Sequence, residues 1–261
     1  MEKNKKLNDM LNEYIRPLTY PVAVKIFKKG EEIGFKVRTP LKDLNYGISL
    51  CQGITIARKY GWVFAFRKED QRCPMAQVIL GYVEEPDFIK NGSLVYPLYT
   101  GTMEAGAKTQ AATPKMPAAD TDAIVLAPLP KAEFEPDVVI IYGNAAQIVR
   151  MVQGGLYQDG GCIESQFSGR GACGGEIVVP FTQNKYNVVI PGGGERVFAL
   201  TADDELVFAL PGTKINEFME GVIKTHEAGA ARFPTPVFGV RAEPKFPKYY
   251  LELEKYCGFE V

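Results

Sequence analysis

Residues 137–142 read DVVIIY, and residues 144–157 read NAAQIVRMVQGGLY. The first segment is apolar and rich in β-branched residues, which is typical of a buried strand. The second has apolar residues every three to four positions, the period of an amphipathic helix, and Gly160 and Gly161 follow its end. A buried strand that leads directly into a helix favours an α/β (mixed α+β) fold.

Similar patterns extend in both directions from this segment. Ser49 is suited to cap a helix that ends before Gly61, and Pro74 suits the first position of another helix, with Cys73 at its N-cap. Helices are expected at residues 7–15, 49–60, 73–82, 144–157 and 214–225. Strands are expected at residues 21–27, 62–66, 94–99, 123–127, 137–142, 162–167, 186–190, 196–200 and 206–209, with a short apolar element at 177–180 and turns at 191–196 (PGGGER) and 201–205 (TADDE).

The order of these elements indicates an internal duplication. Strand, helix, strand, cysteine and short apolar element occur twice, and Gly61 to Cys73 has the same spacing as Gly161 to Cys173. Sequence identity between the two copies is no higher than chance, so the hypothesis rests on element order. We therefore expect one domain, residues 1–261, with pseudo-repeats at about 20–135 and 136–230, mixed sheets with flanking helices, an N-terminal helix and a proline-rich C-terminal wrap at 234–247.

Composition limits the classes of function. The chain has 261 residues, of which 46% are hydrophobic, and its 30 Lys and Arg residues balance 31 Asp and Glu residues, which excludes intrinsic disorder. Without a large basic block, no nucleic acid partner is expected. The sequence has no apolar run of 18 residues and begins with a polar segment, so we expect no membrane association and a cytoplasmic location.

Cysteine is the residue type on which the predicted chemistry depends. The chain has a single histidine, His226, which leaves little material for Ser-His-Asp catalysis or paired-histidine zinc sites. Its five cysteines are an odd number in a chain of cytosolic type, which favours free thiols or metal ligands over disulfides.

Three of the cysteines share an electropositive setting. Cys51 and Cys73 are expected at helix starts, where the helix dipole and free N–H groups favour a thiolate. Cys173 lies in a glycine-rich loop, and Arg72 and Arg170 add positive charge nearby. The resulting prediction is an iron–sulfur cluster, or another thiophilic metal centre, held by Cys51, Cys73, Cys162 and Cys173. The residues expected to contact this cofactor are Gly169, Arg170, Gly171, Gly174 and Arg72.

Alternatives stay open at this point. One thiolate could act as a nucleophile in a metal-free enzyme, with N–H groups of the glycine loop as oxyanion donors. A non-catalytic protein could bind a small molecule between Tyr96, Tyr99 and Trp62. Small cysteines also pack as ordinary core residues. The GRGACG stretch at 169–174 matches a dinucleotide fingerprint, but the segment after it is short and contains Pro180, which argues against that function.

Five stretches carry a resemblance to a known family. They are SLCQGITIARKYG (49–61), QRCPMAQVILGY (71–82), PDVVIIYGNAAQIVRMVQGGLYQDG (136–160), GRGACGGEIVVP (169–180) and GERVFALTADDELVFALPGTKINEFMEGV (194–222). The chain resembles the uncharacterised ArCR family, domain of unknown function 169, whose members come from anaerobic bacteria and archaea. The resemblance implies no particular activity. Together with the cysteines, it favours an anaerobic redox role with a small molecule or an electron-transfer partner, and leaves open whether the protein is an enzyme.

Overall fold

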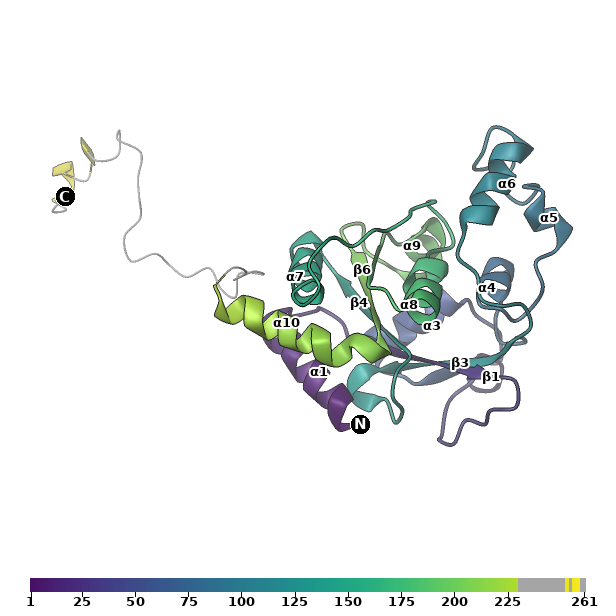
Figure 1. Cartoon of the computed structure of the whole chain (residues 1–261), viewed down its shortest axis with the longest axis horizontal. Helices are drawn as coiled ribbons and strands as arrows, with labels where there is room; N and C mark the ends of the chain where they lie inside the picture. Colours follow the sequence, from purple (N-terminus) through teal and green to yellow (C-terminus); the bar gives the residue numbers. More distant parts are fainter. Residues whose placement is uncertain (230–251, 254, 259–261) are drawn as a thin grey trace.

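The structure is a computed structural model that describes residues 1–229, 252–253 and 255–258. The expected C-terminal wrap at 234–247 lies outside the described residues. The expected mixed α/β class is confirmed, because helices cover both faces of a single six-stranded sheet (Figure 1).

All five strand pairs of the sheet are antiparallel, so the expectation of mixed sheets is wrong. Its strands lie in the order β2-β3-β1-β4-β6-β5. They are β1 (Val22–Lys28), β2 (Phe64–Phe66), β3 (Thr121–Pro128), β4 (Val138–Gly143), β5 (Asn187–Val189) and β6 (Leu206–Pro211). Strand β4, which contains the apolar run predicted at 137–142, is buried along its whole length at the centre of the sheet, beside β1.

Alternate residues of each central strand contact a different layer of helices, as the period of a strand requires. Val138, Ile140 and Tyr142 lie in one apolar cluster, and Val139 and Ile141 lie in the other. The second face is covered by α1 (Glu2–Tyr14), α7 (Ala145–Gly155) and α10 (Ile215–Glu227). The first face carries α3 (Leu50–Thr55), η1 (Ile56–Tyr60), α4 (Pro74–Ile79), η3 (Gly174–Val178), α8 (Val179–Gln183) and α9 (Gly193–Ala199) (Figure 1).

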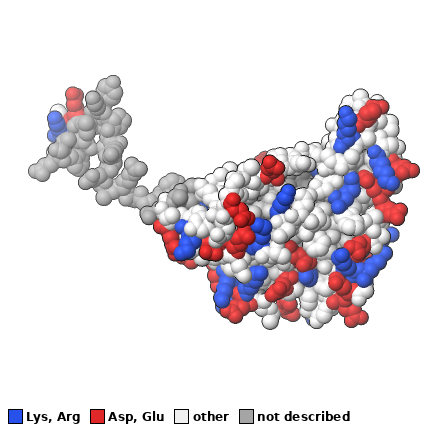
Figure 2. All heavy atoms as spheres, in the orientation of Figure 1, with Lys and Arg blue, Asp and Glu red and all other residues white. Residues whose placement is uncertain are grey.

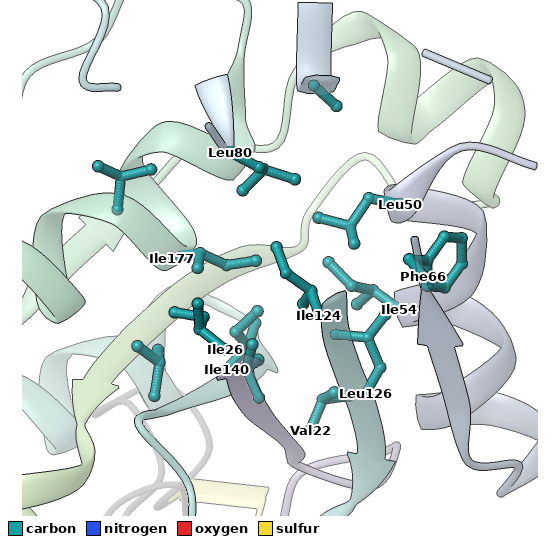
Figure 3. Close-up of a cluster of buried hydrophobic side chains, with 14 of the residues drawn as sticks. Val22, Ile26, Leu50, Ile54, Phe66, Leu80, Ile124, Leu126, Ile140 and Ile177 are labelled. Carbon is teal, nitrogen blue, oxygen red and sulfur yellow. The ribbon is translucent and has the colours of Figure 1, made fainter. Parts of the chain in front are cut away.

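Apolar contacts hold the first-face helices on the sheet. Figure 3 shows the side chains of the helices meeting those of the strands: Leu50, Ile54, Leu80 and Ile177 face Val22, Ile26, Ile124, Leu126 and Ile140. Full burial of one such side chain stabilises the fold by about 1.5–3 kcal/mol, so this layer is held firmly against the strands. Gly53 allows α3 to lie close to β2, because a Cβ on Gly53 would lie 2.3 Å from the ring of Phe66.

Residues 83–116 form an arm that projects from the sheet (Figure 1). It contains α5 (Asp87–Lys90) and α6 (Met103–Ala112), and α2 (Pro40–Leu44) precedes the first-face helices. The strand expected at 94–99 is wrong, since these residues form turns between α5 and α6. Figure 2 shows positive and negative side chains interspersed on the viewed face, with no extended patch of one sign.

Three further expectations at the chemistry-bearing end are corrected. Residues 162–167 form no strand and run as an irregular segment beside β5, where the Ser165 hydroxyl accepts a hydrogen bond from Val188 N–H. The turn expected at 191–196 gives way to α9 from Gly193 onward, while the short apolar element expected at 177–180 is helical. Residues 196–200, expected as a strand after a turn, belong mostly to α9.

The expected correspondence of Cys73 with Cys173 in the two copies is wrong. Cys73 is the N-cap of α4, which follows the edge strand β2, whereas Cys173 is the N-cap of η3, which precedes the edge strand β5. The duplication itself is not confirmed. The strand order does show that each half contributes three strands in the same arrangement, the first central, the second at the edge and the third between them.

Candidate functional site

A glutamine joins the two helix starts that carry Cys51 and Cys73. Ser49 caps α3, as expected, and Cys51 follows in the first turn with its sulfur 3.0 Å from the Ser49 hydroxyl. The side-chain oxygen of Gln71 accepts hydrogen bonds from Leu50 N–H at 3.2 Å and from Cys73 N–H at 3.0 Å. Gln71 is almost completely buried, and its amide nitrogen has no hydrogen-bond partner.

The third cysteine comes from the second half of the chain. Cys173 is the N-cap of η3, at the end of the glycine loop. Gly174 allows the backbone to pass close to Pro114, because a Cβ on Gly174 would lie 2.8 Å from the Pro114 carbonyl oxygen. Cys51, Cys73 and Cys173 are all partly buried free thiols, and we call them the thiol corner. They lie near enough to one another that a negative charge on Cys73 or Cys51 would raise the pKa of Cys173.

Burial dominates the acidity of two of these thiols. It raises the pKa of Cys51 to about 11, and the charges of Glu195, Cys73 and Glu176 raise it further against a hydrogen bond from Ser49. Burial likewise raises the pKa of Cys173 well above its usual value, with the charges of Cys73 and Glu176 adding to the effect. The expectation that helix starts and arginines lower these pKa values is therefore wrong for Cys51 and Cys173.

Two buried carboxyl groups lie beside the thiol corner. Glu176 comes from η3 and Glu195 from α9, and the hydroxyl of Tyr142 lies 2.7 Å from Glu195 Oε1 and 3.5 Å from Glu176 Oε1. Burial and the charge of Glu195 raise the pKa of Glu176 well above its usual value. The site therefore combines three thiols with two carboxyl groups in a region of low solvent access, where uncompensated negative charge is costly.

A buried arginine stands on the other side of the tyrosine. The Arg58 guanidinium lies 3.9 Å from the centre of the Tyr142 ring and makes two hydrogen bonds with Glu205, at 2.5 and 2.9 Å. Glu205 comes from the acidic turn before β6. Sequence reasoning assigned that turn no partner, and nothing local in the sequence connects residues so far apart.

The two arginines predicted to face the cofactor differ in position. The Arg170 guanidinium lies 5.0 Å from the centre of the Tyr99 ring, and its Nη1 is buried without a hydrogen-bond partner. Burial lowers the pKa of Arg170, and the charges of Tyr99 and Cys73 oppose that shift. Arg72 is exposed, and its methylene groups lie against Gly47. Of the pair, the structure places Arg170 beside the thiol corner.

Cys162 lies in a different environment from the other predicted ligands. It is exposed and lines a cavity of about 500 Å³ between the segment 156–172 and α8 and β5. Gly169, Arg170 and Gly171 line the same cavity, while Gly174 is buried at the start of η3. Tyr96, Tyr99 and Trp62, the aromatic residues of the small-molecule hypothesis, are absent from its lining.

Metal-ligating geometry is not preformed. Within the described ranges, no group of three or more His, Cys, Asp or Glu side chains is close enough to hold a metal ion. The same part of the chain also has no helix with the length and apolar character needed to cross a membrane. After the loop that matches the dinucleotide fingerprint, the chain forms the short elements η3 and α8, and no strand directly precedes the loop as that motif requires.

Comparison with known proteins gives a family and a distant relative. The family described as uncharacterised ArCR matches residues 10–221. An uncharacterized protein of Methanocaldococcus jannaschii is 28% identical over 204 residues, which cover 77% of this chain and 85% of the relative. No solved structure matches.

Proposed function

The chain belongs to the uncharacterised ArCR family, and for this member we propose that Cys51, Cys73 and Cys173 hold a thiophilic metal centre, most simply an iron–sulfur cluster with a redox role. The observation that carries the proposal is the pairing of these thiols with two unsatisfied donors. The amide nitrogen of Gln71 and Nη1 of Arg170 are both buried without a hydrogen-bond partner.

Unsatisfied buried donors of this kind are rare in folded proteins, because each costs about 1–3 kcal/mol. Thiolate and sulfide atoms of a bound cluster accept hydrogen bonds, and such bonds tune its reduction potential. Gln71 also links the backbone next to Cys51 to that of Cys73, so the group with the unused donor is the one that positions two proposed ligands.

The electrostatics support the same assignment. Three thiols and two buried carboxyl groups gather in one region, where Arg170 acts on Cys73 and Arg58 acts on Glu176. A bound cation would compensate further negative charge there. Ligand thiols must lose their protons, so metal binding would release protons from Cys51 and Cys173. A metal-free thiolate nucleophile has less support, because the raised pKa values keep both thiols protonated near neutral pH.

Metal analysis of five single-cysteine variants tests the proposal. Protein purified without oxygen should contain iron and acid-labile sulfide, or zinc, and an iron–sulfur form should absorb broadly in the visible range. Cys51→Ser, Cys73→Ser and Cys173→Ser should each lose most of the metal. Cys162→Ser and Cys257→Ser are the matched controls and should keep it.

Two results would contradict the proposal. The first is wild-type protein that contains no metal after anaerobic purification and takes up none on reconstitution. The second is loss of metal in the Cys162→Ser variant together with retention in the three thiol-corner variants. That pattern would move the ligands to the cavity between segment 156–172 and α8.

A further inference from the structure

We propose that the cavity beside Cys162 binds a small organic anion with one negative charge, a carboxylate with an apolar body. The cavity has a volume of about 500 Å³ and lies between the segment 156–172 and α8 and β5. Ligand sites in proteins have volumes of about 300–1,000 Å³ and combine an apolar lining with a few polar groups. The inference goes beyond the proposed metal centre and does not rest on it, because none of the thiol-corner cysteines lines this cavity.

The lining of the cavity supplies the apolar part of the site. Phe167 and Ile190 both line it, and their exposed fractions of 55% and 48% are large for apolar side chains. Leu156, Ile163 and Val179 extend the same apolar surface. Burial of such surface against an apolar ligand is favourable, so an aromatic or alkyl body fits this lining.

The charged residues of the lining determine the charge of the ligand. Three are positive and two are negative, so the lining has one positive charge in excess. Lys214 forms an ion pair with Asp159 at 3.6 Å, and Lys185 and Glu164 are both exposed to solvent. The remaining charge is that of Arg170, and a ligand with a single negative charge balances it.

Arg170 is suited to hold a carboxylate. Its guanidinium lies against the Tyr99 ring, and no described carboxylate forms an ion pair with it. The Ser168 hydroxyl donates a 2.9 Å hydrogen bond to the Arg170 carbonyl oxygen, which helps to fix the loop. A guanidinium presents five N–H donors in a fork that matches a carboxylate. Donors therefore remain for a ligand in the cavity even if the buried Nη1 serves the thiol corner.

Cys162 provides a reporter in the wall of the same cavity. It is a free, exposed thiol, so iodoacetamide can alkylate it in the space that the ligand would fill. Cys257 is also free and exposed but is absent from the lining. The two thiols therefore form a matched pair within one chain, and only Cys162 should respond to a ligand in the cavity.

Calorimetric titration of metal-free protein with 4-phenylbutyrate and with its neutral isostere, 4-phenylbutanamide, tests the inference. The carboxylate should bind at one site and at least about 10-fold more tightly than the amide, because only the carboxylate pairs with the Arg170 charge. Arg170→Gln should remove this difference, and Arg72→Gln, at an exposed arginine outside the lining, should keep it. Saturating 4-phenylbutyrate should slow the alkylation of Cys162 and leave that of Cys257 unchanged.

Three results with wild-type protein would overturn the inference. The first is equal binding of the carboxylate and the amide, or binding of neither. The second is binding of 4-phenylbutyrate without slower alkylation of Cys162, which would place the ligand outside the cavity. The third is tighter binding of 3-phenylpropyl phosphate, a dianion with the same apolar body, which would contradict the single charge. These measurements decide the question even if Arg170→Gln does not fold.

Discussion

The hydroxyl of Tyr142 donates a 2.7 Å hydrogen bond to Oε1 of Glu195, and both side chains are almost completely buried. This bond joins the central strand β4 to helix α9, and Glu195 in turn accepts a hydrogen bond from Gly192 N–H. A side chain of the most buried strand therefore positions the helix start that borders the thiol corner.

Removal of the Tyr142 hydroxyl should destabilise the protein. Tyr142→Phe keeps the ring under Arg58 but leaves Glu195 Oε1 buried without its donor, so the free energy of unfolding in urea should fall by about 1–3 kcal/mol. Tyr60→Phe, in which an exposed hydroxyl is lost, serves as the control and should be nearly neutral. An equal effect of the two substitutions would show that the buried bond contributes nothing.

Neutralisation of Glu176 should change how stability depends on pH. Its pKa in the folded state lies above its usual value, chiefly because of burial, so the folded protein retains a proton that the unfolded chain releases. That contribution to stability is present below the usual glutamate pKa and is lost as pH rises through the folded-state pKa. Glu176→Gln should abolish this loss.

Unfolding curves between pH 4 and 8 provide the measurement for Glu176. At neutral pH, Glu176→Gln should be more stable than wild type by about 0.5–3 kcal/mol, because the unfolded wild-type chain gains free energy by ionising this glutamate and the variant does not. The control is Glu164→Gln, at an exposed residue of the segment beside β5. The expectation is wrong if Glu176→Gln and wild type lose stability in parallel as pH rises.

The ion pair of Arg58 and Glu205 should matter more than a surface pair. The Arg58 side chain has no exposed area, so Arg58→Ala leaves Glu205 without its bidentate partner and should cost about 3–5 kcal/mol. Burial acts to raise the pKa of Glu205, but hydrogen bonds from Arg58 and Ala202 N–H outweigh it and lower that pKa.

The loss of stability at acid pH gives a second measure of the Arg58–Glu205 ion pair. A lowered pKa gives Glu205 a stabilising contribution that is present above its usual pKa and lost as pH falls through the folded-state pKa. This acid-side loss should be smaller in Arg58→Ala. Arg38→Ala, which removes an arginine stacked on Trp62, should cost less than about 1 kcal/mol, and a comparable effect of both variants would contradict the prediction.

Substitutions of Gln71 separate its two roles. Gln71→Glu keeps an acceptor for Leu50 N–H and Cys73 N–H but loses the unpartnered donor and adds negative charge beside the proposed ligands. The affinity of the Gln71→Glu variant for Co²⁺ or iron should differ from that of wild type. Gln71→Leu should be less stable than wild type and should bind the metal about 10–100-fold more weakly. Gln153→Leu, at an exposed position of α7, is the control glutamine. Unchanged metal affinity in both Gln71 variants would remove Gln71 from the site.

The sequence predicted those elements whose local signals agree with their burial. Ser49 caps α3 and Gly61 ends the following helical turn in the left-handed conformation, and the apolar run at 138–142 forms the central strand. Cys73 was correctly expected at the N-cap of α4. In each case a cap, a proline or a strong period points to the same structure as tertiary packing.

One wrong strand prediction, at residues 196–200, occurs where β-branched and aromatic residues form part of a helix. The residue types Val197 and Phe198 favour a strand, but in the structure both are exposed on the helix α9. Gly192 followed by Glu195 three residues later was an available signal for a helix start, since that glutamate side chain bonds the N-cap N–H.

The site itself could be predicted only as residue types. The sequence singled out Cys51, Cys73, Cys173 and Arg170, but it could not show that Cys162 is exposed in the wall of a cavity that none of the other three cysteines lines. The burial that reverses the expected acidity of Cys51 comes from packing across the sheet. Gln71 and Glu176 gave no local signal, since their roles arise from contacts with other elements.

If the thiol corner binds metal as proposed, the central pairing of β1 with β4 makes it a reporter of chain reassembly. If the chain were split between residues 135 and 136, one fragment would carry Cys51 and Cys73 and the other Cys173. Neither fragment alone carries all three cysteines of the thiol corner. Mixed in equal amounts, the two fragments would regain the absorption of the metal centre only by rejoining along the middle of the sheet, so metal colour would measure their complementation.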